Sequence, residues 1–340
     1  MRALVECQTV LRGRVEPAWP AVGDRVGPFA LRGLLGRGGH GRVYLAAQPD
    51  LSDRLVVLKV GPDEGVEHLS LARLQHTHVV PLYSVHEFPE RGLRGLCLPY
   101  FGGATLADLQ NWLGVTGGRP TAGDLAAGLR ASTPTGVDPL AVPVRAFRDD
   151  VPLSDVACRI GASLADALQY AHDRGLLHLD LKPSNVLLAA DGTPMLLDFH
   201  LARPPVPAGD PGPGWLGGTP GYMAPEHESA VNAIRDGRPV PAAVDGRADV
   251  FGLGLVLGEF LRAAKSDVST GLADVLARCT APHAADRYPT AAAVATDLRR
   301  HLSDLPLAGV GNRSLAERWR KWRRRRPYSL ALGLAFVALA

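Results

Sequence analysis

Apolar residues follow two different patterns along this chain. The first hundred residues contain short apolar, β-branched runs such as Leu55–Val60, which predict buried strands. Val43–Ala47 predicts a further strand, and Leu96–Phe101 predicts the last strand of this region and the hinge after it. After residue 150 the apolar positions recur at helical spacing, so helices are expected to replace strands.

The clearest helical series lies between Ser154 and Gly175, which we predict to cap and to end a long helix. Residues three and four apart form its buried face: Val156, Ile160, Leu164, Ala167, Leu168 and Ala171. A shorter helix is expected over residues 64–75, where Glu67 shares the inward face with Leu71 and Leu74.

A glycine-rich turn lies between the first predicted strands, because residues 36–43 read G-R-G-G-H-G-R-V. Glycine has no Cβ, so such a backbone can lie directly against phosphate groups. A dinucleotide-binding fold uses a similar motif but continues into a helix. Here a predicted strand follows, which favours a hairpin turn; an ordinary glycine-rich turn is the remaining alternative.

The polar residues of segment 178–188, His-Leu-Asp-Leu-Lys-Pro-Ser-Asn-Val-Leu-Leu, suit phosphoryl transfer to a hydroxyl. That reaction needs a carboxylate for the hydroxyl proton, a cation near the phosphate and oxygen ligands for Mg²⁺. Thirteen residues after Asn185 comes Asp198-Phe199-His200. Together the two segments resemble the catalytic loop and metal-binding turn of protein kinases.

This resemblance implies a role for each polar residue of the centre. Asp180 would orient the acceptor hydroxyl and take its proton, and Lys182 would stabilise the γ-phosphate. Asn185 and Asp198 would hold Mg²⁺, with Mn²⁺ as an alternative. The expected cofactors are therefore ATP and a divalent metal ion.

The same resemblance assigns the ATP-binding positions of the first hundred residues. Lys59 would contact the α- and β-phosphates and be held by Glu67, with Glu64 as the second choice on the same helix stripe. Leu98 would be the gatekeeper beside adenine, and Tyr100 would lie in the hinge. The turn would contribute four ATP-binding residues: Gly36, Gly38, Gly41 and Val43.

Three later motifs occur in the order that protein kinases have. Segment 218–226, G-T-P-G-Y-M-A-P-E, resembles the end of an activation segment, where Thr219 would support Asp180 and Lys182. Asp249 would hold the backbone of the catalytic loop from a central helix. Arg287 would form a buried ion pair with Glu226.

The resemblance implies an α+β, bilobal protein kinase fold, with a small, mainly β lobe carrying one key helix and a larger, mainly α lobe. We expect an N-terminal extension over 1–28, the small lobe over 29–98 and the large lobe over 99–305. Residues 114–152 lack a sustained period, and we interpret them as an inserted, partly disordered loop.

The C-terminal sequence is strongly basic and then apolar. Segment 306–327 contains the run R-W-R-K-W-R-R-R-R, which is typical of the cytoplasmic flank of a membrane span. Residues 328–340 are apolar but reach only ~20 Å as a helix, short of a bilayer core of about 30 Å. We therefore interpret them as the start of a transmembrane helix, with a peripherally packed tail as the alternative. Membrane lipids are the expected partners of the basic segment.

Composition excludes several other classes of function. Net charge is only +3 over 340 residues, so no nucleic-acid partner is expected. The four cysteines are scattered without metal-ligand spacing and are expected to be free thiols. From the basic segment and the apolar residues after it, the protein is expected at the cell membrane, single-pass, with its kinase domain cytoplasmic.

The resulting prediction is an ATP-dependent serine/threonine protein kinase similar to bacterial eukaryotic-like kinases. It would act on protein substrates in membrane-linked signalling. A homodimer is compatible with this prediction. Leu179 and His200 replace the arginine of His-Arg-Asp and the glycine of Asp-Phe-Gly. Family members use that arginine to pair with a phosphate on the activation segment. A pseudokinase that acts as a membrane-tethered nucleotide-binding scaffold is the alternative function.

Overall fold

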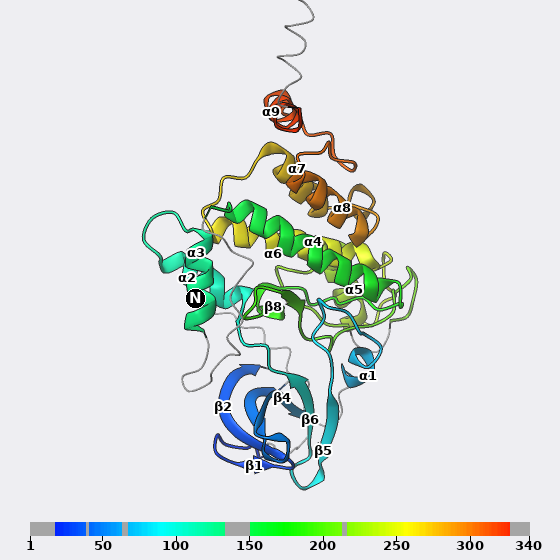
Figure 1. Cartoon of the computed structure of the whole chain (residues 1–340). Helices are drawn as coiled ribbons and strands as arrows, with labels where there is room; N and C mark the ends of the chain where they lie inside the picture. Colours follow the sequence, from blue (N-terminus) through cyan, green and yellow to red (C-terminus); the bar gives the residue numbers. More distant parts are fainter. Residues whose placement is uncertain (1–17, 39–40, 63–66, 133–149, 213–215, 327–340) are drawn as a thin grey trace, which may run out of the picture. The chain divides into compact units, whose positions relative to one another are not determined.

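The computed structural model describes residues 18–38, 41–62, 67–132, 150–212 and 216–326. The chain divides into two compact units (Figure 1). Unit 1 contains residues 1–68 and 82–100, and unit 2 contains residues 69–81 and 101–340.

Unit 1 is built on a six-stranded sheet in which all neighbouring strands are antiparallel, in the order β1-β2-β3-β4-β6-β5. The strands are β1 (Arg25–Val26), β2 (Phe29–Gly38), β3 (Gly41–Gln48), β4 (Arg54–Pro62), β5 (Ser84–Phe88) and β6 (Leu93–Pro99). Two short 3₁₀ turns, η1 (Pro49–Leu51) and η2 (Pro89–Arg91), connect strands. The three strands predicted from apolar runs are confirmed within β3, β4 and β6.

Side chains alternate along β4 between the core and the opposite face. Val56, Leu58 and Val60 are fully buried, whereas Val57 and Lys59 between them are only partly buried. Successive residues of a strand point to opposite faces, so the pleat places Lys59 away from the apolar core. A charged residue therefore fits an otherwise apolar strand.

The N-terminal boundary of the sheet differs from the prediction of an extension over 1–28. β1 pairs with β2, with Val26 opposite Phe29. The Tyr44 hydroxyl donates a hydrogen bond of 2.7 Å to the carbonyl oxygen of Pro20. Residues 20–26 are thus part of unit 1, although they are too short and too polar to have a recognisable strand period.

Helix α1 (Glu67–Leu71) ends earlier than the predicted helix over 64–75. Beyond it the Arg73 N–H bonds to the Ser70 carbonyl and the Leu74 N–H to the Leu71 carbonyl, three residues back instead of four. The Gln75 N–H then bonds to the hydroxyl of Tyr170. Leu71 and Leu74 are buried as predicted, while residues 63–66 lie outside the described part of the chain.

Unit 2 is mainly helical (Figure 1). Its helices are α2 (Leu106–Val115), α3 (Ala122–Ala131), α4 (Leu153–His172), α5 (Pro225–Arg235), α6 (Gly246–Ala263), α7 (Thr270–Cys279), α8 (Ala291–Leu302) and α9 (Leu315–Arg325). A small sheet of β7 (Ala104–Thr105), β8 (Val186–Leu188) and β9 (Pro194–Leu196) flanks the catalytic loop, with 3₁₀ turns η3 (Pro183–Asn185) and η4 (Ala284–Asp286). α4 packs against both α6 and α8.

Helix α4 confirms the predicted buried face but not the predicted cap. All six predicted core residues of this helix are buried. The N–H groups of Asp155 and Val156 both bond to the Pro152 carbonyl, so the helix begins at Leu153 and Ser154 lies inside it. Its end agrees with the prediction, because Gly175 adopts φ +70° and its N–H bonds to the His172 carbonyl.

The segment predicted as an inserted loop over 114–152 is partly helical. Thr121 and Asp124 form a capping box that opens α3, and α3 packs against α2. Leu125 and Leu129 bury one side of this helix. The loop prediction is therefore wrong for residues 122–131, and residues 133–149 lie outside the described part.

The basic C-terminal segment continues unit 2. Asp297 is fully buried and accepts hydrogen bonds from the N–H groups of Ala308 (2.6 Å) and Gly309 (2.8 Å). α9 follows, with Ser314 as its N-cap. None of the helices in the described residues is long and apolar enough to cross a membrane. The predicted transmembrane segment 328–340 lies outside those residues.

The described cysteines, Cys97, Cys158 and Cys279, are buried free thiols, as the sequence predicts. Burial raises the pKa of both the Cys158 and Cys279 thiols to about 12, so neither is a reactive thiolate near neutral pH.

Candidate active site

Asp249 of α6 fixes the backbone of the catalytic loop. Its carboxylate accepts hydrogen bonds of 2.8 Å from the N–H groups of His178 and Leu179, and lies 2.8 Å from Nε2 of His172. Burial favours a raised pKa for Asp249, but these hydrogen bonds and the nearby histidines hold its pKa below the ordinary value. Leu179 adopts φ +62°, a left-handed conformation stabilised by the bond from its N–H.

Asp180 lies at the centre of a polar network. Its Oδ2 is 2.9 Å from Nζ of Lys182, and its Oδ1 accepts a 2.5 Å hydrogen bond from the Thr219 hydroxyl. Lys182 also donates to that hydroxyl, at 2.8 Å. Asp180 is only 3% exposed, so the charge of Lys182 compensates a buried carboxylate. Thr219 contacts the two residues that the sequence assigns to it.

Asn185 and Asp198 are brought near each other by the backbone. The Leu197 N–H donates to the Asn185 carbonyl at 2.9 Å, so the predicted metal ligands lie on neighbouring segments. The Asn185 amide nitrogen bonds to the Asp180 carbonyl oxygen (2.8 Å) and to Asp180 Oδ2 (3.0 Å). The side-chain amide oxygen of Asn185 and the part-exposed Asp198 carboxylate are hard oxygen donors, the ligand type that Mg²⁺ prefers.

His200 lies beside the same carboxylate. Its Nδ1 is 2.5 Å from Oδ1 of Asp198. The replacement of glycine by histidine therefore places an imidazole in direct contact with a predicted metal ligand. The sequence alone did not indicate this contact.

Glu226 and Arg287 form the ion pair that the sequence predicts. Arg287 is fully buried, and its Nη1 and Nη2 lie 2.7 and 2.8 Å from the two carboxylate oxygens of Glu226. The guanidinium also donates to carbonyl oxygens of Ala281, Pro282 and Arg247. This buried pair joins the first turn of α5 to the segment before α8.

The predicted ATP-binding residues all belong to unit 1, whereas the catalytic, metal-binding and structural residues all belong to unit 2. Within unit 1, Gly36, Gly38 and Gly41 lie on the β2–β3 hairpin, and Lys59 pairs with Val43 and with Leu96 in the sheet. Gly41 has φ +140°, and a Cβ there would lie 2.1 Å from the Val60 carbonyl oxygen. Glycine is thus required at this position.

The remaining unit 1 candidates are Leu98, Tyr100 and Glu67. Leu98 is half-buried in β6, opposite Val57, and Tyr100 is the last residue of unit 1. Burial raises the pKa of the Tyr100 hydroxyl. Glu67 begins α1, but its side chain lies outside the described part, so its pairing with Lys59 stays a prediction.

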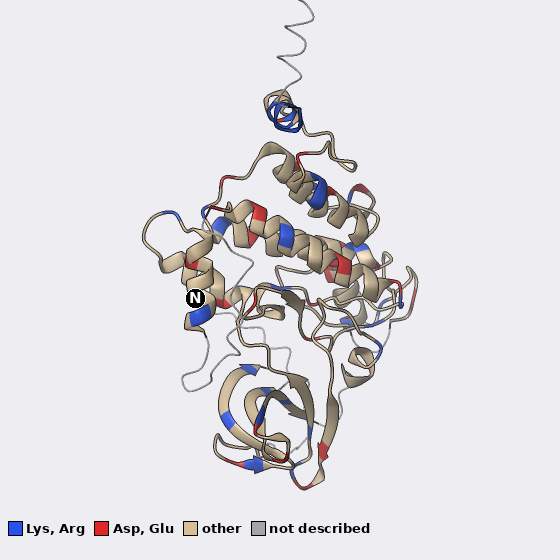
Figure 2. Ribbon diagram, in the orientation of Figure 1, with Lys and Arg blue, Asp and Glu red and all other residues tan. Residues whose placement is uncertain are grey.

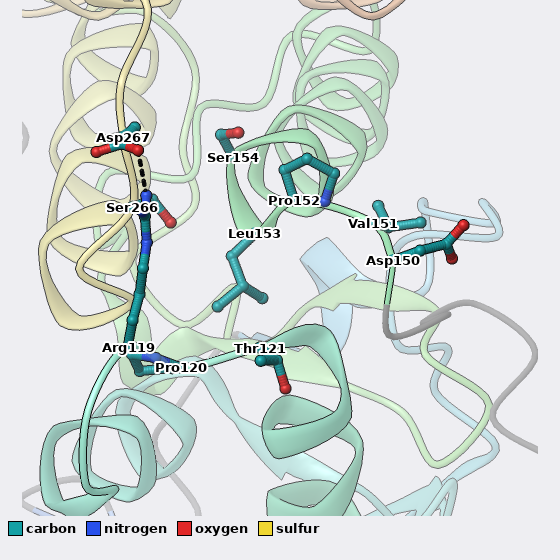
Figure 3. Close-up of a pocket in the computed structure, with 10 residues that line it drawn as sticks. All are labelled: Arg119, Pro120, Thr121, Asp150, Val151, Pro152, Leu153, Ser154, Ser266 and Asp267. Carbon is teal, nitrogen blue, oxygen red and sulfur yellow. Dashed lines mark ion pairs between the residues drawn. The ribbon is translucent and has the colours of Figure 1, made fainter.

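Two cavities in unit 2 differ in their relation to these residues. A cavity of about 170 Å³ lies beside Lys182 and is also lined by Ser184, Tyr222 and Gln110. A larger cavity of about 450 Å³ lies between the starts of α3 and α4 and contains none of the predicted site residues (Figure 3). Arg119 and Asp267 form an ion pair of 2.6 Å at its edge.

Comparison with known proteins agrees with this geometry. Residues 145–285 match the protein kinase domain family. The chain contains a protein kinase domain. The predicted α+β kinase fold, with a β-rich first part and a helical second part, is thereby confirmed.

Bacterial serine/threonine kinases are among the similar proteins. PknD of Mycobacterium tuberculosis is 31% identical over 286 residues, which cover 80% of this chain and 34% of that protein. PknE of Mycobacterium bovis is 33% identical over 253 residues, 70% of this chain and 35% of its own length. The DNA damage-responsive kinase RqkA of Deinococcus radiodurans is 31% identical over 250 residues, 68% of this chain and 29% of its own. The kinase-containing chain spans about a third of the length of these relatives.

Sequence reasoning missed two residues that shape the site. His172, at the end of α4, contacts Oδ2 of Asp249, the oxygen that also accepts from the His178 N–H, and no motif marked it. Leu179 lies in an apolar cluster with Val206 and Leu216 of the activation segment. The only available signal was its departure from arginine.

Proposed function

We propose that this chain is an ATP-dependent protein kinase that transfers the γ-phosphate of ATP to serine or threonine hydroxyls of proteins. The network of Asp180, Lys182 and Thr219 supports this most directly, because it presents a positioned carboxylate beside a cation. Asp-Leu-Lys-Pro at 180–183 is the pattern of the serine/threonine class, and the similar bacterial proteins bear that name.

In the proposed mechanism, Asp180 orients the acceptor hydroxyl and accepts its proton. Lys182 stabilises charge on the transferred phosphate, and Thr219 holds both side chains in place. Asn185 and Asp198 would hold Mg²⁺, or Mn²⁺, which neutralises phosphate charge when bound. Lys59 and the hairpin with Gly36, Gly38 and Gly41 would bind the ATP phosphates.

The test is phosphoryl transfer to a generic protein substrate by two variants. Lys59→Met removes a positive charge and Asp180→Asn removes the proton acceptor, and both groups act mainly in the transition state. Each variant is expected to lose at least about 100-fold in rate. Lys265→Met and Asp236→Asn, at exposed positions, are the matched controls and should keep full activity. Wild-type rates in either test variant would contradict the proposal.

A pseudokinase is the second candidate, and the contact between His200 and Asp198 favours it. An imidazole 2.5 Å from the carboxylate competes with a metal ion for that oxygen. The alternative predicts ATP binding without phosphoryl transfer. The variant His200→Gly distinguishes the active kinase from the pseudokinase. If the wild type transfers no phosphate and His200→Gly raises the transfer rate at least tenfold, the result would support the scaffold function.

We further propose that the kinase works at the cell membrane, as a single-pass protein with its kinase domain cytoplasmic. The supporting observation is the sequence, in which a basic segment with two tryptophans precedes the apolar residues 328–340. Fractionation of cells expressing the chain tests this location. Recovery of the intact chain only in the soluble fraction would contradict it.

A further inference from the structure

Helix α9 buries charged residues against the rest of unit 2. Glu317 and Lys321, one helical turn apart, are only 4% and 9% exposed. Glu317 Oε2 accepts a hydrogen bond of 2.9 Å from the Gly271 N–H at the start of α7. Lys321 Nζ lies 3.2 Å from Glu317 Oε1 and 3.0 Å from Nδ1 of His301 in α8. The inner face of α9 is thus held by a compensated ion pair.

The outer face of α9 carries two large apolar residues. Leu315 is 73% exposed and Trp319, one turn later, is 51% exposed. The Arg323 guanidinium stacks 4.9 Å from the Trp319 ring centre. This arrangement reverses the usual one, in which a surface helix turns its apolar stripe inward and its charges outward. Large exposed apolar side chains side by side indicate a contact with something apolar.

Cations surround this apolar pair. Figure 2 shows α9 as mostly blue, the colour of lysine and arginine. The exposed arginines are Arg318, Arg320, Arg323, Arg324, Arg325 and Arg326. Arg324 lies 3.6 Å from Asp304, and the single acidic residue of the helix, Glu317, is buried. The outer face therefore combines net positive charge with apolar side chains.

The orientation of this face on unit 2 is fixed. The connection from α8 to α9 is held by the buried Asp297 carboxylate, which also accepts from the Tyr288 hydroxyl at 2.7 Å. Burial lowers the pKa of His301, so this ring is neutral and can accept a hydrogen bond from the Lys321 ammonium group. The α9 surface is thus joined to the rest of unit 2 by several polar contacts.

We propose that the outer face of α9 is a binding surface for an anionic lipid bilayer, with Leu315 and Trp319 entering the interface and the arginines contacting headgroups. The proposal rests on the membrane location proposed above and names the element that makes the contact. Arginines also suit nucleic acid, but an exposed leucine contributes neither charge nor a ring to that recognition. A basic helix with leucine and tryptophan on its free face is typical of interfacial binding.

The test is co-flotation of the full chain with vesicles of phosphatidylcholine, alone and with phosphatidylglycerol. Arg320→Glu combined with Arg325→Glu reverses two exposed charges of α9, and Trp319→Ala removes the ring of the outer face. The matched control is Arg235→Glu with Arg238→Glu, at the end of α5 and just after it, where both side chains are also exposed (67% and 64%). We expect at least ~10-fold weaker binding to anionic vesicles for the charge variant, since each basic residue contributes about 1 kcal/mol. Trp319→Ala should weaken binding less, and the control should bind like wild type.

Other outcomes would overturn the assignment. Unchanged flotation of both test variants would place the contact outside α9, for instance in residues 328–340. Equal binding to neutral and anionic vesicles would remove the role of the arginines. Tighter binding of a single-stranded RNA than of vesicles, lost in the same variants, would assign the face to nucleic acid.

Phosphoryl transfer to a soluble substrate and thermal unfolding are measured on the same samples. Both should be unchanged in all variants, because none of these residues belongs to the active site or to the buried ion pair. A chain that binds vesicles but transfers no phosphate would contradict the kinase proposal and leave this one standing.

Discussion

The two sides of the catalytic loop are stabilised in different ways. Asp180 faces a network of charged and hydroxyl groups, whereas its neighbour Leu179 enters an apolar cluster with Leu177, Val206 and Leu216. The polar side needs particular atoms at particular distances, so it tolerates few residue types. The apolar side needs only volume and shape, so many sequences can build it.

The largest effect is expected on the apolar side. Leu179→Ala removes a side chain that is 95% buried in this cluster and should lower the free energy of unfolding by about 2–5 kcal/mol. Urea unfolding measures it. Leu69→Ala, at a leucine that is 58% exposed, is the control and should cost far less. Equal losses in the two variants would show that the cluster does not hold the loop.

This difference explains what the sequence could and could not predict. Asp180, Lys182, Asn185 and Asp198 could be proposed from the sequence because their chemistry restricts residue type and spacing. β4 was predicted because it is an apolar, β-branched run, and α4 because its apolar period is strong. In contrast, α3 was missed because its short stripe of leucine and alanine is weak, although the capping pair Thr121 and Asp124 was present in the sequence.

Other errors have physical causes as well. β1 has only two residues and is defined by pairing with β2, which no local pattern encodes. The docking of α9 depends on Glu317 and Lys321, whose sequence context is a surface charge run, and only tertiary contacts reveal that they are buried. The cluster around Leu179 joins segments far apart in sequence, so periodicity contains no trace of it.

A smaller effect is expected when the polar side is weakened. Thr219→Val removes the hydroxyl that donates to Asp180 and accepts from Lys182, while keeping nearly the same volume. A hydrogen bond to a charged group is worth about 1.5–3 kcal/mol, so kcat should fall roughly 10- to 100-fold with little change in stability. Thr219→Ser keeps the hydroxyl and should retain most of the activity. Comparable losses in both variants would indicate that the methyl group, not the hydroxyl, matters.

The polar side should also weaken selectively in acid. The pKa of Asp249 is held below its ordinary value of 3.8, so the stability it contributes is present above that pH and is lost as pH falls through the folded-state pKa. The free energy of unfolding, measured over a pH series, should therefore fall more steeply below pH 3.8 in wild type than in Asp249→Asn. The asparagine side chain has no carboxylate to protonate in this range. Parallel curves for the two proteins would contradict this assignment.

No effect on activity is expected from removing phosphate from the protein. In related kinases an arginine at the Leu179 position pairs with a phosphate on the activation segment, and residues 201–217 contain no serine, threonine or tyrosine. Here backbone pairing holds the segment instead: Val206 and Val244 exchange hydrogen bonds of 3.0 and 2.9 Å, and Gly209 N–H bonds to the Val240 carbonyl at 2.9 Å. Val206 and Leu216 add apolar contacts to the Leu179 cluster, so a phosphate has neither an acceptor residue nor its usual cationic partner.

The test is phosphatase treatment of the purified chain, with mass spectrometry to verify that all phosphate is removed. The initial rate on an added protein substrate should stay unchanged within a factor of about two. A segment that depended on phosphate would lose charge-assisted hydrogen bonds worth several kcal/mol, and the rate would change with them. Val206→Asp is the complementary variant, because it places a charge in the apolar cluster and should lower the rate where dephosphorylation does not. A large loss on dephosphorylation, restored by rephosphorylation at an identified residue, would show that this kinase domain depends on phosphate after all. The contrast between the two sides of the catalytic loop would then reflect stability alone and not the control of activity.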